Sequence, residues 1–218
     1  VREVNTASKL AELKGAALMK GDVTDIDSLK AATALVDTVI DVHGVRPPRF
    51  VKLRDLFRAP LESDLTHPYS INYKGTRNLL EAMELNQNRK LVRLTGALVG
   101  ASAFKPFVAL FNFLLSYSNA WHEKSEKLIR ESGIDYTVVR PSEIVDEPSC
   151  RGLTYPAVGV LPQPRHLVAV PGDGKAKIPV PSKISKYDVA SLCVEAAVKQ
   201  RHHHHQDGGS SFLSKSTI

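Results

Sequence analysis

Two patterns of apolar and polar residues alternate along this chain. One is a short apolar run, and the other is a longer segment in which apolar residues recur at helical spacing. Ala16 to Met19, Val36 to Val42 and Lys90 to Thr95 are short runs rich in aliphatic residues, which are typical of strands. From Ile71 to Met83, apolar or small residues recur every three or four positions, as on one face of a helix. Alternation of strands and helices predicts an α/β fold with a parallel sheet and helices on both faces.

The clearest local signals lie between Trp121 and Pro141. Helical spacing from Trp121 to Ile129 is followed by Gly133, which suits the left-handed position after a last helical turn. Tyr136 to Val139 is β-branched and apolar enough for a strand that is covered on both faces. Pro141 cannot continue a ladder, so the chain leaves the sheet there. Because ligands bind at the carboxyl ends of strands in open α/β sheets, this segment predicts a binding crevice.

The remaining segments complete a single domain over residues 1–200. A helix is expected after a cap at Asp25 or Asp27, and a long loop from Arg46 to Thr66. From Cys150 to Pro181 we expect an irregular region with short strands at 167–170 and 178–180. A final helix is expected over 184–198. It is followed by a low-complexity linker at 201–211 and the start of a last strand at 212–218.

One segment also resembles a known family. The run SEKLIRESGIDYTVVRPSEI, from Ser125 to Ile144, is similar to the helix–strand–loop signature of the atypical short-chain dehydrogenase/reductase superfamily, in its NmrA-like and NAD(P)-binding-domain groups. The resemblance extends from Val1 to about Val198 and implies a Rossmann-like, doubly wound parallel sheet, with Asp188 capping the last helix. The sequence contains no Gly-rich turn that could approach a pyrophosphate, so we expect a chain truncated at its N-terminus, without the first strand and that turn.

The resemblance implies a site for NADP, with NAD as the less favoured cofactor. Arg2 and Lys9 match positions that contact the 2′-phosphate, and a guanidinium suits phosphate geometry. Asp22 and Val23 match the element that flanks the adenine, although Asp22 could equally serve only to cap a turn. The other matching positions follow successive strands: His43 and Gly44, then Thr95 and Gly96, then Pro141, Ser142, Glu143 and Ile144 near the nicotinamide.

Catalytic members of the superfamily use a Tyr and a Lys four residues later, on one face of a helix. Those positions fall on Ser118 and His122, so the usual pair is absent. His122 and Lys124 remain as candidate proton donors, and His122 is the better one because imidazole titrates near neutral pH. The alternative is that both are ordinary surface residues on an exposed helix face.

Two functions therefore stay open, and so does the question of whether the chain is an enzyme. One is an NADP-dependent reductase of a small apolar carbonyl or alkene, for which the Phe-rich stretch from Phe104 to Tyr117 could form an apolar wall. The other is a non-catalytic NADP-binding regulator or assembly factor that acts through a protein partner. No motif in the sequence indicates the substrate or the oligomeric state.

Composition and charge limit the classes of partner and the compartments that we expect for this protein. The net charge is +6, but basic residues are scattered, so no nucleic-acid surface is predicted. No run of about 18 uncharged apolar residues occurs, so we expect a soluble protein without a membrane span. Two cysteines favour a reducing compartment, such as the cytoplasm or an organelle stroma or matrix. We assign no metal to His202 to His205, because nothing would orient four adjacent imidazoles.

Overall fold

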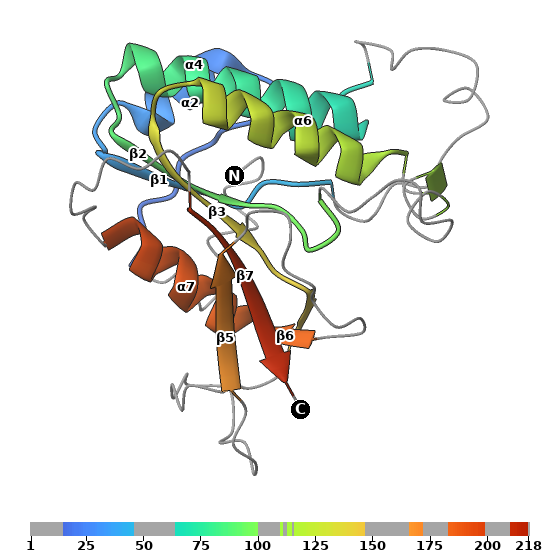
Figure 1. The fold of residues 1–218 in the computed structure, drawn as a ribbon. Helices are drawn as coiled ribbons and strands as arrows, with labels where there is room; N and C mark the ends of the chain where they lie inside the picture. Colours follow the sequence, from blue (N-terminus) through green and yellow to red (C-terminus); the bar gives the residue numbers. More distant parts are fainter. Residues whose placement is uncertain are drawn as a thin grey trace.

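A computed structural model describes residues 15–45, 64–99, 110, 113–114, 116–146, 166–171, 183–198 and 210–217. A five-stranded sheet forms its centre (Figure 1). The spatial order of its strands is β1 (Thr38–Asp41), β2 (Lys90–Leu94), β3 (Asp135–Arg140), β7 (Ser210–Thr217) and β5 (His166–Pro171). The first four strands are parallel, and β5 runs antiparallel to β7. A second, two-stranded parallel sheet joins β4 (Glu143–Val145) to β6 (Lys183–Ser185).

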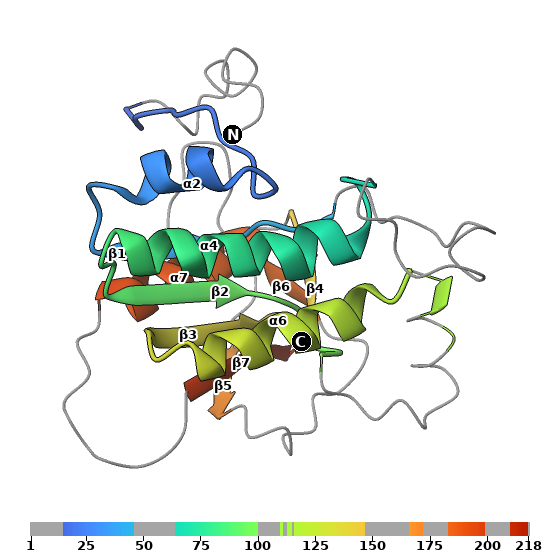
Figure 2. The same cartoon turned by 90° about the horizontal axis from the view of Figure 1, so that it is seen from above.

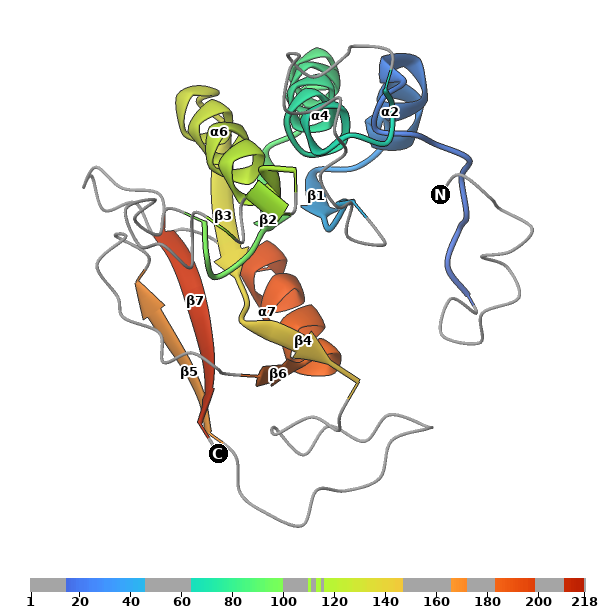
Figure 3. The ribbon, with the colours of Figure 1, turned by 90° about the vertical axis from the view of Figure 1, so that its right-hand side faces the viewer.

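Helices cover both faces of the larger sheet. One face carries α2 (Ile26–Thr33), the π-helical turn η2 (Tyr69–Lys74) with α4 (Gly75–Leu85), and α6 (Ser118–Glu131). The opposite face carries α7 (Lys186–Val198), and the end-on view in Figure 3 shows the sheet between these two layers. Seen from above, α4 and α6 run along β2 and β3 (Figure 2). This arrangement confirms the predicted Rossmann-like doubly wound α/β fold.

Local sequence explains how these elements start and stop. The Asp25 side chain accepts hydrogen bonds from the amides of Asp27 and Ser28, so Asp25 is the N-cap of α2. Gly133 has φ +75 after α6, in the left-handed region that glycine adopts without strain. The signals that end these elements were therefore visible in the sequence.

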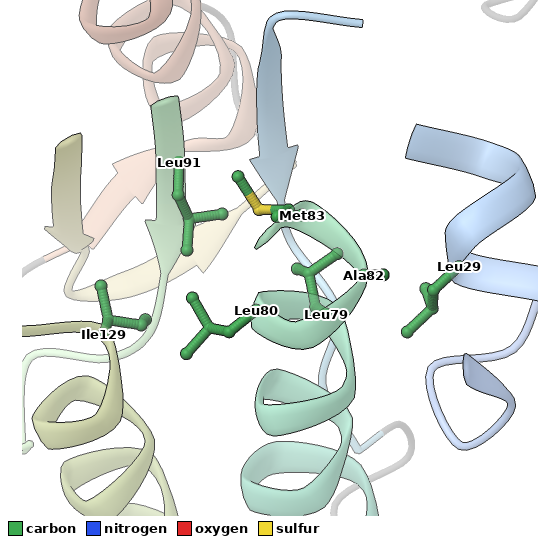
Figure 4. Close-up of a cluster of buried hydrophobic side chains, with 7 residues drawn as sticks. All are labelled: Leu29, Leu79, Leu80, Ala82, Met83, Leu91 and Ile129. Carbon is green, nitrogen blue, oxygen red and sulfur yellow. The ribbon is translucent and has the colours of Figure 1, made fainter. Parts of the chain in front are cut away.

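Two apolar clusters hold the layers together. Figure 4 shows the larger cluster, in which side chains from α2, α4, α6 and β2 meet: Leu29, Leu79, Leu80, Ala82, Met83, Leu91 and Ile129. The second lies between the sheet and α7 and contains Val92, Val139, Ile184, Val189 and Cys193. Burial raises the pKa of the Cys193 thiol to about 11, so this cysteine stays protonated at neutral pH.

Two details of the expected fold need correction. Residues 16–19 carry no strand in the structure, although their apolar run predicted one. Ser210 and Ser211 belong to β7 rather than to a linker, because they pair with Thr137 and Val138 of β3. Asp188 lies buried in the first turn of α7, where the Ser185 hydroxyl accepts a bond from the Tyr187 amide, and its expected capping role stays a prediction.

Several expectations lie outside the described residues. These are the loop over 46–63, most of the Phe-rich stretch over 104–117, the expected strand at 178–180, and His202 to His205.

Candidate functional site

The carboxyl ends of β1, β2 and β3 lie next to one another because the three strands are parallel neighbours. Backbone hydrogen bonds tie the two loops that follow β2 and β3. The Thr95 amide donates to the Val139 carbonyl and the Ala97 amide donates to the Pro141 carbonyl, each at 2.9 Å. The predicted positions Thr95, Gly96 and Pro141 are thus brought together, as expected at the ligand-binding edge of an α/β sheet.

A second group of predicted positions meets at the start of α4. A Cβ placed on Gly75 would lie 2.9 Å from Val23 Cγ2 and 3.3 Å from His43 Nε2. The Asn78 amide nitrogen donates to the Val23 carbonyl at 3.1 Å. Only glycine allows this close approach, so Gly75 brings Val23 and His43 into one neighbourhood.

Asp22 has a clear structural task in the turn before α2. Its Oδ1 accepts from the Thr24 amide at 3.0 Å and from the Thr24 hydroxyl at 2.9 Å. Asp22 therefore forms the turn, as the alternative prediction stated. This role does not move Asp22 away from its position next to Val23.

A buried charged network lies beneath the exit of β1. Arg93 of β2 is fully buried, and its Nη1 contacts Asp41 Oδ2 at 2.9 Å and donates to the His43 carbonyl at 3.0 Å. Asp41 Oδ1 lies 2.6 Å from His43 Nδ1. Burial raises the pKa of Asp41, but the charges of Arg93 and His43 outweigh it and hold that pKa well below the usual range. Arg93 Nε and Nη2 are buried and have no hydrogen-bond partner in the part of the chain that the structure describes.

His122 lies in the electrostatic field of this network, on the first half of α6. Burial, followed by the positive charges of Arg93 and His43, lowers the pKa of His122 to about 3, and the charge of Asp41 opposes this only in part. Its Nδ1 is buried and has no hydrogen-bond partner among the described residues. His122 is therefore neutral at pH 7 and is not the exposed surface residue that formed the alternative prediction.

The turn before α6 places Ser118 opposite η2. Ser116 and Tyr117 have φ of 51 and 58, an unusual pair of left-handed residues directly before the helix. Asn72 of η2 then donates to the Ser118 hydroxyl at 3.0 Å. Ser118, which the resemblance aligns with the superfamily's Tyr, is thus hydrogen-bonded across the helix interface one turn before His122.

A second buried ion pair ties α6 to the sheet. Glu126 is fully buried, and both of its carboxylate oxygens accept bonds from Arg140 at the end of β3. Arg130 adds a bond at 2.8 Å, and the Thr95 hydroxyl donates to Glu126 Oε1 at 2.8 Å. The Thr95 side chain is therefore engaged with Glu126, while its backbone stays at the exit of β2.

The other predicted cofactor positions are two glycines with open space beside them and the loop after β3. No described atom lies within 4 Å of a Cβ built on Gly44 or on Gly96. Ser142 Oγ is buried and finds no hydrogen-bond partner within the described ranges. Glu143 is exposed, and Ile144 borders an apolar cavity of about 300 Å³ with Val42, Leu94 and Val189.

Comparison with known families agrees with this geometry. Residues 1–200 match the model of a family described as NAD(P)H-binding. The chain belongs to this NAD(P)H-binding family. Membership bears out the predicted relationship to the atypical short-chain dehydrogenases and the assignment of an NAD(P)-binding Rossmann-like domain.

Relatives of this NAD(P)H-binding chain include proteins named TIC 62, chloroplastic. The Arabidopsis thaliana protein is 33% identical over 79 residues, which is 36% of this chain and 12% of that protein. The Pisum sativum protein is 27% identical over 124 residues, or 57% of this chain and 20% of that protein. The chain therefore spans a small part of the length of these relatives.

Solved structures show the same fold at low sequence identity. A Bacillus halodurans protein named as an NAD-dependent epimerase/dehydratase has a TM-score of 0.68 at 16% identity, covering 100% of this chain and 80% of its own. The anaerobilin reductase ChuY of Escherichia coli O157:H7 has a TM-score of 0.61 at 16% identity, covering 98% and 81%. A short-chain dehydrogenase/reductase of Veillonella parvula, solved with NADP, has a TM-score of 0.59 at 11% identity, covering 94% and 76%.

The described residues fit a dinucleotide along this edge. The open sides of Gly44 and Gly96 leave room for a ligand against the backbone, and the free Ser142 hydroxyl offers it a hydrogen bond. Arg2 and Lys9 lie outside the described residues, so their contact with a 2′-phosphate stays a prediction. Within the described ranges, no cluster of metal-ligating side chains occurs, and no helix is long and apolar enough to cross a membrane.

Sequence reasoning missed the charged networks below this edge. Asp41, Arg93, Glu126 and Asn72 were not predicted as site residues. One signal was available, because Arg93 and Arg140 interrupt otherwise apolar strands that were expected to be covered on both faces. A buried charge requires a partner, and that requirement points to a second charged residue nearby.

Proposed function

We propose that this chain binds NADP along the carboxyl ends of β1, β2 and β3. The adenine half would lie beside Asp22 and Val23, and the nicotinamide half beside Gly96 and the loop from Pro141 to Ile144. The observation that carries the proposal is the convergence of these separately predicted positions on one edge of the sheet.

The preference for NADP over NAD rests on Arg2 and Lys9. A 2′-phosphate carries negative charge that a guanidinium and an ammonium would neutralise, whereas an acidic residue would suit the free ribose hydroxyl of NAD. Glu3 is adjacent to Arg2 in the sequence, so replacing Arg2 is the direct test of this preference.

We further propose a reductase activity on a small, apolar carbonyl or alkene. When bound, NADPH supplies the hydride. Of this chain's own residues, His122 is the candidate to assist at the substrate oxygen. Because its low pKa keeps the ring neutral at pH 7, it would act by donating an N–H hydrogen bond rather than as an imidazolium. The Asn72–Ser118 hydrogen bond would hold the first turn of α6 in place beside it.

A non-catalytic role is the second candidate, and one observation favours it. Ser118 and His122 stand where the superfamily's catalytic Tyr and Lys would stand, so the usual acid is replaced. In that case the bound dinucleotide would set which surface is presented to a protein partner. The chloroplastic names of the curated relatives favour an organelle as the compartment of either version.

Turnover distinguishes the two candidates. Full-length protein would be assayed for NADPH oxidation with a panel of aldehydes, ketones, quinones and activated alkenes. The reductase proposal predicts turnover that His122→Ala lowers by about tenfold or more, while Lys124→Ala, an exposed position on the same helix, leaves it unchanged. NADPH binding without turnover on any compound would favour the regulator, and full activity of His122→Ala would remove His122 from the mechanism.

A further inference from the structure

The His43 ring lies between two hydrogen-bond acceptors. Its Nδ1 is 2.6 Å from Asp41 Oδ1, and its Nε2 is 3.0 Å from the carbonyl oxygen of Ile71 in η2. The His43 backbone amide also donates to Asp41 Oδ1, at 3.1 Å. A carbonyl oxygen and an ionised carboxylate can only accept hydrogen bonds.

Either neutral form of the ring would leave one of these contacts unfavourable. With the proton on Nδ1, the lone pair of Nε2 would face the Ile71 carbonyl. With the proton on Nε2, the lone pair of Nδ1 would face the Asp41 carboxylate at 2.6 Å. Arg93 Nη1 lies 3.1 Å from Nδ1, but this nitrogen already contacts Asp41 Oδ2 and donates to the His43 carbonyl. Only the doubly protonated ring donates to both acceptors.

We infer that His43 is a positively charged latch that ties the exit of β1 to η2 and thereby positions the backbone of His43 and Gly44. The groups that face the ring are Asp41 on β1, Arg93 on β2 and His122 on α6, while η2 presents the Ile71 carbonyl and α4 presents Gly75. Asp41 neutralises one of the two cations, so the latch carries a net positive charge below this edge of the sheet.

The position of the latch connects it to the proposed dinucleotide site. Gly44 has open space beside it, and Val23 and His43 both approach Gly75. This part of the inference rests on the proposed function. If the latch opens, the loop after β1 is no longer held against η2, and the nucleotide loses a pre-formed surface together with a favourable positive potential.

The first test concerns the ring alone and needs no cofactor. Ring ¹⁵N chemical shifts of the full-length protein would be recorded by NMR at about pH 7.5. The latch predicts that both nitrogens of His43 carry protons. His67 is an internal control, because its Nδ1 accepts from the Tyr69 amide at 3.0 Å and so cannot be protonated there. A neutral His43 ring, with His67 behaving as expected, would overturn the latch.

The second test is the affinity for NADPH at about pH 7.5. We expect His43→Gln to bind NADPH about tenfold more weakly than wild type, because one charge-assisted bond is lost. His67→Gln should keep the wild-type affinity. Equal affinities of wild type and His43→Gln would refute the positioning role even if the ring is charged. Failure of every protein to bind NADPH would remove the proposed function and the positioning role, while the NMR result would still decide the latch.

Discussion

The two ends of the layer between the sheet and α2, α4 and α6 have opposite chemistry. Toward the amino ends of the strands the layer is apolar, with Leu79, Met83, Leu91 and Ile129 in contact (Figure 4). Toward the carboxyl ends it is charged, with the Asp41–His43–Arg93 network and the Glu126–Arg140 pair, in which Arg93 and Glu126 are fully buried.

This difference separates stability from function. Apolar burial stabilises a fold by about 25 cal/mol for each Å² removed from water, whereas buried ion pairs often contribute little net stability. A charged half-layer is thus an inefficient way to hold helices on a sheet. Local departures from good packing concentrate at functional sites, and here the departure lies at the edge where the dinucleotide positions converge.

The largest expected effect comes from breaking the buried pair. In Glu126→Gln, Arg140 stays buried without a full counter-charge, so we expect a loss of about 3 kcal/mol in the free energy of unfolding. Urea unfolding at pH 7 measures it. Glu131→Gln removes an exposed partner of Lys127 on the same helix and should cost less than about 0.5 kcal/mol. Similar losses for both variants would contradict the assignment of Glu126 as the anchor of α6.

A substitution in the larger apolar cluster tests whether stability and nucleotide binding depend on different halves of the layer. Met83→Ala removes a fully buried side chain from the larger cluster, and we expect a loss of about 2–4 kcal/mol. The Kd for NADPH of the folded variant should change much less than its stability, because Val23 is the described nucleotide position that packs against this cluster. Leu85→Ala, which is exposed at the end of the same helix, is the control. A large change in Kd for Met83→Ala would show that the two halves are not separable.

The charged half should also make stability depend on pH. The pKa of His122 falls from 6.5 in the unfolded chain to about 3 in the folded protein, so the unfolded state binds more protons between these values. Stability contributed by neutral His122 is therefore present above about pH 6.5 and is lost as the pH falls, by about 2 kcal/mol at pH 5. Urea unfolding from pH 7 to 5 should show this slope, and His122→Gln should lose it. An unchanged slope in the variant would contradict the buried neutral state.

The smallest effect on stability is expected at Gly75. In Gly75→Ala, the new Cβ meets Val23 at 2.9 Å, and the cost of that contact is offset by the roughly 1 kcal/mol better helix propensity of alanine. We expect a net change within about 1 kcal/mol. The displacement of Val23 and His43 should nevertheless weaken NADPH binding several-fold, as measured by calorimetry. Unchanged affinity would place the adenine away from Val23.

Much of the fold was predictable because its signals are local. The Asp25 cap, the Gly133 stop and the apolar strand before Pro141 each depend on neighbouring residues alone. The expected strand at 16–19 was wrong because the tertiary context of a segment can override its strand propensity. The π-helical η2 was missed because its apolar spacing differs little from that of an α-helix.

The candidate site was predictable only in outline. The resemblance placed positions at strand ends, and the parallel topology brings them together. The network was not visible because Asp41, Arg93 and His122 come from distant segments, and their pairing depends on which strand faces which helix. His43 was predicted as a cofactor-binding position, but the two hydrogen-bond acceptors of its ring became known only from the structure.

The most direct test of the central claim is calorimetric titration of NADPH and NADH into full-length protein and into Gly96→Leu. A side chain at Gly96 points into open space among the described residues, so the variant should keep its fold, which urea unfolding checks. We predict that wild-type protein binds NADPH more tightly than NADH and that folded Gly96→Leu binds neither. Undiminished NADPH binding by Gly96→Leu would contradict a dinucleotide site along this edge of the sheet.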